Sequence, residues 1–446
     1  MSHYKPYPAY KDSGVDWLGP VPDHWQVVRM RYAATLNPPV RSDLLGDPDQ
    51  EVSFLPMEAI GEDGSLSLEQ VRPVADVRNG YSYFEDGDVA FAKVTPCFEN
   101  GKGALMRGLQ CAAGFGTTEL TVLRPKPAAA DARYINYIVQ GSSFRAFGAG
   151  AMTGAGGLKR VPDEFTRNFP VPLPELGEQR LIAAHLDSET TRIDTLIEKK
   201  TRFIELLREK RQALITHAVT KGLDPSVKMK DSGVEWLREV PEHWGVSPLK
   251  HLVRFRSGGT PSKDNLEFWN GDIPWASAKD LKQEVLADTI DHLNQSAIES
   301  GAASLVPSGS ILVVVRGMIL ARLFPVVETL VPMAINQDLK ALVPSGKLNS
   351  RYLAHLLRGS SAESLSRLEE AGHGTKALRM ENWVSIELPV PPLHEQLAII
   401  EMLDIQTARL DSLADKTERS IALLTERRSA LITAAVTGQI DLREAV

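Results

Sequence analysis

The sequence predicts an α+β protein with a pseudo-two-fold internal repeat, in which two domains of similar fold are separated by two long antiparallel helices that form a coiled coil. Two frame segments occur twice: KDSGVDWLGPVPDHW at 11–25 returns as KDSGVEWLREVPEHW at 230–244, and PVPLPELGEQ at 170–179 returns as PVPPLHEQ at 389–396. In each half a long stretch of heptad apolar spacing follows the second segment. The inserts between the segments, 26–169 and 245–388, barely resemble each other. The chain therefore repeats a frame and varies the inserts that the frame carries.

The composition is that of an ordinary folded protein. The 446 residues are 43% hydrophobic and 24% charged, which allows two to four domains with ample cores. No apolar run approaches the length of a membrane span, and the N-terminus lacks the apolar core of a signal peptide, so we expect no membrane partner. We expect the two cysteines, Cys97 and Cys111, to be reduced thiols in a bacterial-type cytoplasm.

The net charge of −7 argues against a protein that coats nucleic acid by bulk charge. Each insert carries nearly equal numbers of basic and acidic residues. Specific DNA binding stays compatible with this balance, because a basic face can lie opposite an acidic one. Such inserts would need locally clustered cations, or partner subunits that supply much of the phosphate contact.

Each insert is predicted to be an α+β domain. Strand-like runs occur at 88–93 and 120–124 in the first insert, and at 310–316 and 339–343 in the second. A short helix follows at 132–139 and at 350–357, and then a Gly-rich loop at 148–160 and at 372–379. The same order of elements indicates a shared fold with diverged surfaces.

The stretch from Glu178 to about Lys221 predicts the first long helix. Its apolar seam, interrupted by Lys200, consists of Leu186, Ile193, Leu207 and Leu214. A second row at Ile182, Leu196 and Phe203, together with Ile197 and Ile204, broadens this stripe. Gly222 and Pro225 end the helix.

The second long helix repeats the pattern, and Gly438 ends it. Its seam, with Thr417 at the place of Lys200 and with Leu413 and Ile421 extending the stripe, consists of Leu403, Leu410, Leu424 and Leu431. Each helix of about 40 residues would be roughly 60 Å long, too long for a lone surface helix. Two such stripes bury best against each other, and two repeats close most simply around a pseudo-two-fold axis, which makes the helices antiparallel. A helical hairpin inside one domain, or a coiled coil that only dimerises the chain, is the alternative.

These elements divide the chain into four segments: a first domain at 1–173, a first spacer helix at 174–221, a second domain at 222–391, and a second spacer helix with a C-terminal tail at 392–446.

The order of these motifs resembles the specificity subunit of a type I restriction–modification system. The resemblance rests on the repeated frame and its Glu-Gln pairs, and on Gly258-Gly-Thr-Pro-Ser262, Ile273-Pro-Trp-Ala276 and Asn336-Gln-Asp338 in the second insert. It covers nearly the whole chain. The first insert departs from the pattern, with Asn37-Pro-Pro-Val-Arg41 in place of the Gly-Gly-Thr-Pro-Ser block and Gly116-Thr-Thr-Glu119 in place of Asn-Gln-Asp.

The resemblance implies that the inserts are two target recognition domains and that the chain itself is not an enzyme. It implies a bipartite, asymmetric site on double-stranded DNA, with an unread spacer set by the helix pair. It also implies two modification subunits, which use S-adenosylmethionine to methylate adenine, and two restriction subunits, which use ATP and Mg²⁺ to translocate and cleave DNA. This chain would hold no cofactor and no metal.

Base readout in the major groove uses Arg or Lys for guanine and Asn or Gln for adenine, so we expect polar side chains on insert loops to contact DNA. The candidates in the first insert are Lys93, Thr95, Asn100, Lys102, Arg107, Thr117 and Thr118. Those in the second are Ser257, Thr260, Ser262, Lys263, Lys279, Arg316, Arg322, Asn336 and Gln337. Four cations after Gly-rich turns suit phosphate contacts: Lys159, Arg160, Lys376 and Arg379. For each residue an ordinary solvated side chain is the alternative, and for Asn336 and Gln337 a hydrogen bond within a turn.

Two other functional classes stay open. One is a coiled-coil scaffold whose inserts bind proteins, and the other is an enzyme with unrecognised chemistry. The sequence shows no phosphate-binding loop, no Asn-Pro-Pro-Tyr-type methylation motif and no nuclease carboxylate set. His24 and His243 recur with the frame, but no cluster with metal-ligand spacing accompanies them. A DNA-recognition subunit is therefore the leading hypothesis.

Overall fold

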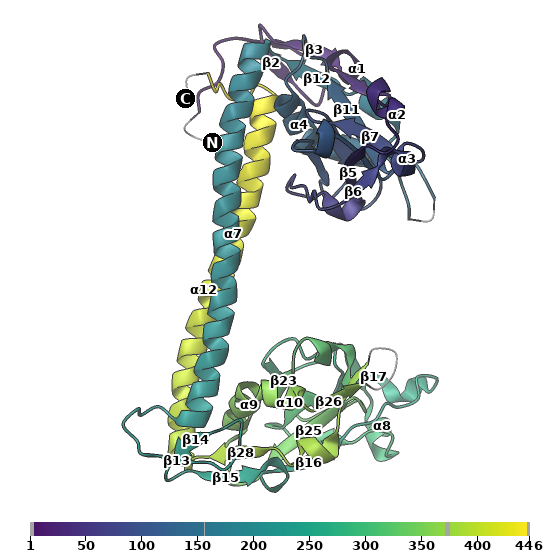
Figure 1. Ribbon diagram of the computed structural model, residues 1–446. Coiled ribbons are helices and arrows are strands. Elements are labelled where there is room, and N and C mark those ends of the chain that lie inside the picture. Colours follow the sequence, from purple (N-terminus) through teal and green to yellow (C-terminus); the bar gives the residue numbers. More distant parts are fainter. Residues whose placement is uncertain (1–3, 156, 371–374, 444–446) are drawn as a thin grey trace. The chain divides into compact units, whose positions relative to one another are not determined.

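The computed structural model describes residues 4–155, 157–370 and 375–443, and the chain divides into two compact units (Figure 1). The first unit contains residues 1–200 and 419–446, and the second contains residues 201–418. Each unit holds one α+β domain and one half of each long helix. The expected Gly-rich loop at 372–379 lies partly outside the described residues.

The domain of the first unit contains two four-stranded sheets, in the orders β4-β11-β8-β9 and β6-β5-β10-β7, and the two-stranded ribbons β1-β2 and β12-β3. Its strands are β1 Tyr10–Asp12, β2 Pro20–Pro22, β3 Gln26–Arg29, β4 Ala34–Leu36, β5 Glu51–Leu55, β6 Val71–Pro73, β7 Ser82–Glu85, β8 Val89–Ala92, β9 Gly103–Leu105, β10 Ala113–Gly116, β11 Leu120–Pro125 and β12 Pro170–Leu173. Its helices are α1 Met30–Ala33, α2 Ser42–Gly46, α3 Val74–Val77, α4 Ala132–Gln140, α5 Ser142–Gly150 and α6 Asp163–Asn168.

The domain of the second unit contains a five-stranded sheet, β16-β25-β21-β23-β18, a four-stranded sheet, β19-β17-β24-β20, a three-stranded sheet, β22-β27-β26, and the ribbons β13-β14 and β15-β28. Its strands are β13 Met229–Asp231, β14 Glu239–Pro241, β15 Gly245–Pro248, β16 Val253–Ser257, β17 Trp269–Ala276, β18 Val285–Leu286, β19 Asp291–Leu293, β20 Leu305–Val306, β21 Ile311–Val314, β22 Arg316–Gly317, β23 Val326–Thr329, β24 Met333–Ile335, β25 Leu339–Pro344, β26 Leu368–Glu370, β27 Lys376–Leu378 and β28 Glu387–Val390. Its helices are α8 Gln295–Glu299, α9 Ser350–Gly359, α10 Ser361–Leu365 and α11 Met380–Trp383.

The two domains share one skeleton, as the order of their elements predicts. In each, the central pair of a four-stranded sheet is parallel: β5 with β10, where Leu55 faces Gly116, and β17 with β24, where Ala276 faces Ile335. The expected strands β8, β11, β21 and β25 form antiparallel pairs in the other sheet. β8 and β21 are buried along their whole length, which explains why their sequences are continuous apolar runs.

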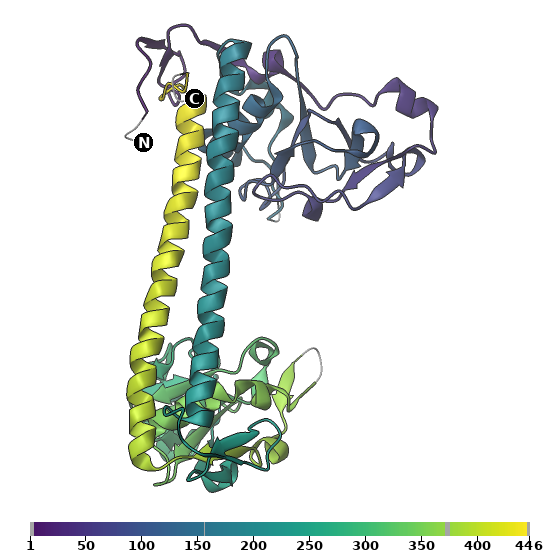
Figure 2. The ribbon, with the colours of Figure 1, turned by 60° about the vertical axis from the view of Figure 1, so that its left-hand side comes forward.

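The two long helices are present: α7 is Leu176–Lys221, of 46 residues, and α12 is Leu393–Val436, of 44 residues. Both stop at a glycine with a left-handed backbone, Gly222 at φ +79° and Gly438 at φ +75°. The helix halves pair antiparallel in each unit (Figures 1 and 2). In the first unit Arg428 lies 2.9 Å from Asp194, and in the second Arg211 lies 3.0 Å from Asp411.

The buried seam of the helix pair is narrower than the sequence predicts. Of the first heptad row, Leu186, Ile193, Leu207, Leu403, Leu410 and Leu431 are buried, and Leu214 and Leu424 are partly buried. The expected second row is wrong at Leu196 and Phe203, which are 39% and 43% exposed, and Leu413 is also exposed. The row that accompanies the seam lies four residues after each heptad position, at Thr190, Ile197 and Ile204, as coiled-coil geometry requires, and it contains the two isoleucines that the sequence adds to the stripe.

A buried glutamine anchors each domain to the start of its long helix. Gln179 accepts a hydrogen bond from the N–H of Asp131 and donates to the carbonyls of Ala129 and Pro174. Gln396 accepts from the N–H of Asn349 and donates to the carbonyls of Lys347 and Pro391. Asp131 and Asn349 are themselves the N-caps of α4 and α9. The repeated glutamine thus fixes the same short helix in both units.

The neighbouring glutamate holds the repeated His-Trp pair. The carboxylate of Glu178 accepts from the indole N–H of Trp25 at 3.2 Å and lies 2.8 Å from His24 Nε2. Glu395 binds Trp244 and His243 in the same way, at 2.9 and 2.6 Å. Both tryptophans are fully buried. The frame motifs that recur in the sequence are therefore contacts that attach each domain to its helix.

Candidate nucleic-acid interface

Three segments that are distant in the sequence meet at one place in each domain. In the first domain the N–H of Lys93 donates to the carbonyl of Glu119, the N–H of Val161 donates to the carbonyl of Lys93, and Val94 forms a β-bridge with Arg160. In the second domain the N–H of Val315 donates to the carbonyl of Asp338, and the N–H of Leu378 donates to the carbonyl of Val315. The backbone of Arg316 there pairs with Ala377, as Val94 pairs with Arg160. We call these equivalent places the three-segment clusters.

The cluster of the first domain collects most of the residues expected to contact DNA. Thr95 Oγ1 accepts from the N–H of Lys159 at 2.9 Å and bonds the carbonyls of Gly157 and Lys159, so this threonine holds the Gly-rich loop. Thr117 Oγ1 accepts from the N–H of Glu119, and Thr118 is exposed beside it. The loop itself supplies two of the candidate cations, Lys159 and Arg160.

Arg160 and Glu119 form a bidentate ion pair in this cluster. Nε and Nη2 of the guanidinium donate to the two carboxylate oxygens at 2.8 and 2.7 Å. The hydrogen bonds from Arg160 hold the pKa of the Glu119 carboxyl below its ordinary value, although partial burial opposes the shift. Sequence reasoning missed Glu119, because nothing local to it indicates that an arginine 41 positions away in the chain will meet it.

The other candidates of the first domain lie outside the cluster. Asn100 donates to Glu62 at 2.9 Å, and the ammonium of Lys102 donates to the carbonyl of Met57 at 3.0 Å. Arg107 is exposed and lines a separate polar cleft. The structure therefore does not bring these three residues together with Lys93, Thr95 and Arg160.

The cluster of the second domain carries amides and hydroxyls. The hydroxyl of Thr260 donates to the side-chain oxygen of Gln337, which is exposed. Asn336 is only 8% exposed, and its side chain bonds Asp338 within the turn. Of the two possibilities left open for Asn336, the structure therefore shows the turn hydrogen bond. Ser257, at the end of β16, accepts from Lys340 on the adjacent strand.

Several candidate cations of the second domain are already paired with carboxylates. Lys376 lies 2.8 Å from Glu370, Lys279 lies 2.6 Å from Asp291, and Arg379 pairs with Glu369. Among the described residues of the second domain, three exposed candidate cations make no ion pair: Lys263, Arg316 and Arg322. Ser262 accepts from the N–H of Asp264 in a local turn.

Gly258 serves a purpose that the sequence does not predict. A Cβ on Gly258 would lie 1.9 Å from the carbonyl oxygen of Ile335 and 2.4 Å from that of Asn336. The glycine is therefore needed for close approach to the protein's own backbone at the end of β24. This contact places Gly259 and Thr260 beside Gln337.

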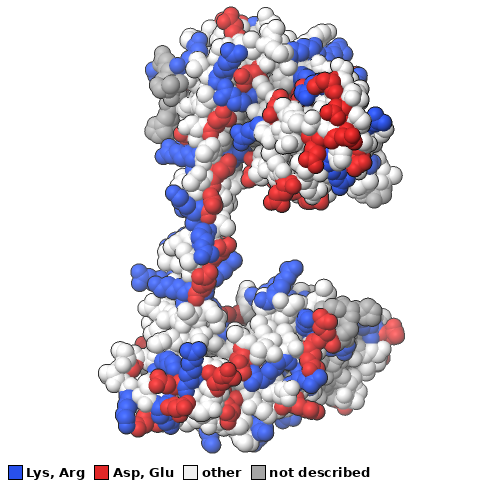
Figure 3. Space-filling model, in the orientation of Figure 1, with Lys and Arg blue, Asp and Glu red and all other residues white. Residues whose placement is uncertain are grey.

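The surface charges are mixed. Figure 3 shows Lys and Arg side chains among Asp and Glu side chains over the visible face of each unit. This distribution agrees with the balanced composition of the inserts. Any attraction of a polyanion must therefore come from local groups such as the clusters.

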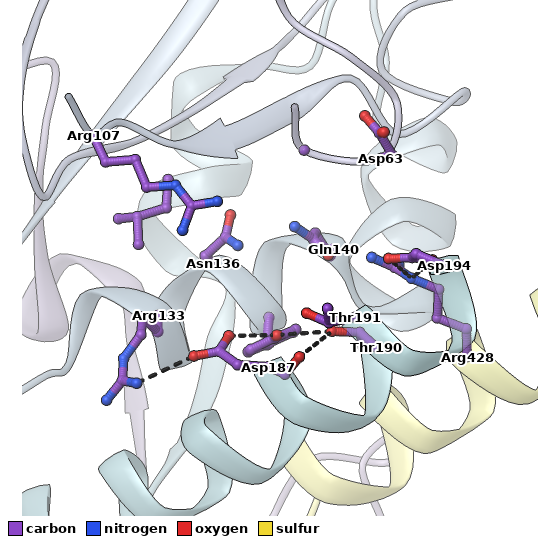
Figure 4. Close-up of a pocket in the computed structure, with 13 residues that line it drawn as sticks. Asp63, Arg107, Arg133, Asn136, Gln140, Asp187, Thr190, Thr191, Asp194 and Arg428 are labelled. Carbon is purple, nitrogen blue, oxygen red and sulfur yellow. Dashed lines mark hydrogen bonds and ion pairs between the residues drawn. The ribbon is translucent and has the colours of Figure 1, made fainter. Parts of the chain in front are cut away.

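A polar cleft of about 300 Å³ lies in the first unit, between α4, the helix pair and the loop around Asp63 (Figure 4). Arg133 lies 3.1 Å from Asp187, and Arg428 lies 2.9 Å from Asp194. The hydroxyl of Tyr137 donates to Asp187 at 2.7 Å. Since two of the three arginines that line this cleft are neutralised by carboxylates, the cleft is less suited than the cluster to bind a polyanion.

The described residues contain no group of three or more His, Cys, Asp or Glu side chains that could hold a metal ion. Within the same residues no helix is long and apolar enough to cross a membrane.

Comparisons with known proteins point to one family. Residues 241–421 match the family model of the type I restriction modification DNA specificity domain. The chain is 39% identical over 164 residues to the EcoEI specificity subunit of Escherichia coli, a match that covers 36% of this chain and 27% of that protein. It is 29% identical over 259 residues to the EcoR124I/EcoR124II specificity subunit of Escherichia coli, covering 58% of this chain and 60% of that protein. The chain thus spans less than two thirds of the length of these relatives.

Two solved structures share the fold over nearly the whole chain. One is a chain from a type I restriction–modification system, with a TM-score of 0.75, 19% identity, and coverage of 94% of this chain and 99% of that one. The other is the HsdS subunit from Thermoanaerobacter tengcongensis, with a TM-score of 0.55, 18% identity, and coverage of 94% and 98%.

Proposed function

We propose that this chain, in which residues 241–421 match the type I restriction modification DNA specificity domain, is the non-catalytic DNA-recognition subunit of a type I restriction–modification complex. One observation carries the proposal: both domains build the same three-segment cluster from the same backbone hydrogen bonds, yet place different side chains on it. A repeated scaffold with unlike polar surfaces suits the reading of two unlike DNA half-sites.

Each domain would read one half-site of a bipartite, asymmetric sequence on double-stranded DNA. The first domain offers Lys93, Thr95 and Arg160 at its cluster, whereas the second offers Arg316, Thr260 and Gln337. Because these sets differ in charge and in hydrogen-bonding groups, the two half-sites would not be copies of each other.

The helix pair would set the unread spacer between the half-sites. α7 and α12 are continuous helices of 46 and 44 residues with a heptad seam, which suits a spacer of fixed length. Four residues inserted near Thr201 and four near Glu418 would lengthen the pair by about 6 Å, or about two base pairs. An unchanged spacer in such a variant would contradict this role.

The chemistry would belong to partner subunits. We propose that two modification subunits supply S-adenosylmethionine and methylate adenine, and that two restriction subunits supply ATP- and Mg²⁺-dependent translocation and cleavage, in the cytoplasm. This chain would contribute the address on the DNA.

Sequencing of methylated adenines tests the proposal. A host that expresses the chain with its modification subunits should methylate one bipartite sequence, and a host that lacks this chain should not. Exchange of residues 26–169 for the insert of another specificity subunit should change one half-site and leave the other. Methylation that does not depend on the chain, or DNA binding without sequence preference, would favour a scaffold instead.

A further inference from the structure

The guanidinium of Arg160 has one edge that none of the described residues binds. Its side edge, formed by Nε and Nη2, is occupied by the two carboxylate oxygens of Glu119. Arginine has five N–H donors, so the end edge, formed by Nη1 and the second hydrogen of Nη2, stays available. Among the described residues nothing bonds Nη1, and the side chain is 44% exposed. The guanidinium is thus held on one edge and open on the other.

The backbone around this fork is fixed on both sides. Arg160 exchanges two backbone hydrogen bonds with Thr153, at 2.8 and 3.0 Å, and forms a β-bridge with Val94. The carbonyl of Glu119 accepts from the N–H of Lys93 at 2.8 Å. Because both partners stand on hydrogen-bonded segments, the orientation of the guanidinium is set before any ligand binds.

A contribution to folding stability does not explain the ion pair between Arg160 and Glu119. An exposed ion pair contributes little to folding, because water screens it and two long side chains lose freedom to form it. What the pair does supply is pre-organisation, since a ligand need not order the arginine again. An arginine held by a carboxylate on its side edge is therefore arranged for a ligand at its end edge.

The end edge matches guanine. In the major groove guanine presents two neighbouring acceptors, O6 and N7, and a guanidinium fork binds both at once. A phosphate can also accept from both donors of a guanidinium fork, but that contact does not depend on the base, so a preference at one base position distinguishes guanine from phosphate.

We propose that Arg160 reads a guanine in the half-site of the first domain, and that Glu119 is the positioning residue that holds its guanidinium. This inference rests on the proposed function and gives Arg160 a different role from the phosphate contact that the sequence predicts.

The second domain carries different side chains at the positions equivalent to Arg160 and Glu119, which supports a difference between the two half-sites. The backbone position equivalent to Arg160 is Ala377, and the one equivalent to Glu119 is Asp338, which is bonded to Asn336. Ala377 has no polar side chain. The exposed groups nearby are the amide of Gln337 and the guanidinium of Arg316, so the second domain has no arginine at the position equivalent to Arg160 and carries a different set of side chains there.

The test is selection of binding sequences from a random-sequence duplex DNA library, with the chain assembled with its modification subunits. The wild-type complex should enrich a bipartite sequence with a guanine at one position of one half-site. Arg160→Ala should lower the preference for that guanine by about 10- to 100-fold and leave the other positions unchanged. Arg160→Lys keeps the charge but loses the fork, so it should lose the preference and keep the affinity for mismatched DNA.

Glu119→Gln and Lys159→Ala separate the roles of the neighbours. Glu119→Gln should weaken the preference at the same position by less than Arg160→Ala does, because the arginine stays but its fork is held less firmly. Lys159→Ala, the matched control on the adjacent residue, should weaken binding to all sequences alike. The three positions changed carry exposed or half-exposed side chains, so unaltered thermal unfolding can confirm that the four variants fold.

Two outcomes would count against these ideas in different ways. If the wild type enriches a defined sequence and Arg160→Ala weakens all sequences equally, Arg160 contacts phosphate and the inference is wrong, while the proposed function stands. If the wild type enriches no sequence, the proposed function itself fails.

Discussion

The short helix that joins each domain to the long helices makes the same anchoring contacts in the two units. The two units differ in the side chains at two other equivalent positions of this helix. α4 and α9 share an Asx N-cap, an arginine that pairs with a carboxylate of the long helix, and a buried tyrosine at equivalent positions. Further along, Tyr137 and Gln140 of α4 stand where α9 has His355 and Arg358.

The space beside these residues differs accordingly. In the first unit the side-chain oxygen of Gln140 is buried without a hydrogen-bond partner among the described residues, beside the cleft of about 300 Å³. In the second unit the longer Arg358 reaches Glu284, at 3.1 Å, and the carbonyl of Val326, and Arg211 of α7 also pairs with Glu284. The comparison teaches that the frame requires the cap, the glutamine and the tyrosine, and that the remaining contact with the helices is free to diverge with the insert.

The largest effect on stability is expected when Arg358 and Gln140 are each replaced by the residue at the equivalent position of the other unit. Arg358→Gln in the second unit should lower the free energy of unfolding by about 3 kcal/mol, because it removes a buried guanidinium whose partners stay behind. Gln140→Arg in the first unit should change it by less than about 1 kcal/mol, because the cleft has room for the longer side chain and nearby carboxylates, Asp63 and Asp194, to pair with it. Thermal and denaturant unfolding measure both. Equal losses in the two variants would show that the second unit is not held more firmly at this point.

Replacement of the buried glutamines should instead lower the free energy of unfolding by nearly equal amounts in the two units. Gln179→Ala and Gln396→Ala each remove three hydrogen bonds and leave a backbone N–H and two carbonyls unpaired. A loss of about 2 to 3 kcal/mol in the free energy of unfolding is expected for each. A loss for one variant and none for the other would contradict the equivalence of the anchors.

His355 should make the second unit sensitive to acid. The pKa of His355 is lowered from 6.5 to about 4, first by burial and then by the nearby Arg358, while the hydrogen bond to Asp404 opposes the shift. Since the folded pKa lies below the unfolded one, the unfolded state takes up a proton first as the pH falls. The stability contributed by neutral His355 is therefore complete above pH 6.5 and is lost between about pH 6.5 and 4.

Between pH 8 and pH 5 the contribution of His355 to the free energy of unfolding should fall by about 2 kcal/mol. This fall should be absent in the His355→Gln variant. Denaturant unfolding of the wild type and the variant at both values measures the difference. Tyr137, at the equivalent position, has its pKa raised by burial and does not titrate in this range. If His355→Gln retains the full loss of stability in acid, other groups cause it.

The sequence predicted the elements that depend on short-range pattern. The ends of α7 and α12 follow from Gly222 and Gly438, and the strands β8 and β21 follow from unbroken apolar runs. The shared skeleton of the two domains also follows, because the same elements recur in the same order. The second row of the helix seam was predicted wrongly at Leu196 and Phe203, because apolar side chains there resemble a buried row but point away from the partner helix.

By itself, then, the sequence determined the repeat, the two long helices and the main strands of each insert, because each is written in local periodicity or in motifs that stand close together in the chain. Only the tertiary structure decided which polar groups meet. The pairing of Arg160 with Glu119, the turn that occupies Asn336 and the backbone contact that requires Gly258 all join segments that are distant in the sequence. Such contacts depend on how sheets and loops pack, and no pattern along a single segment carries that information.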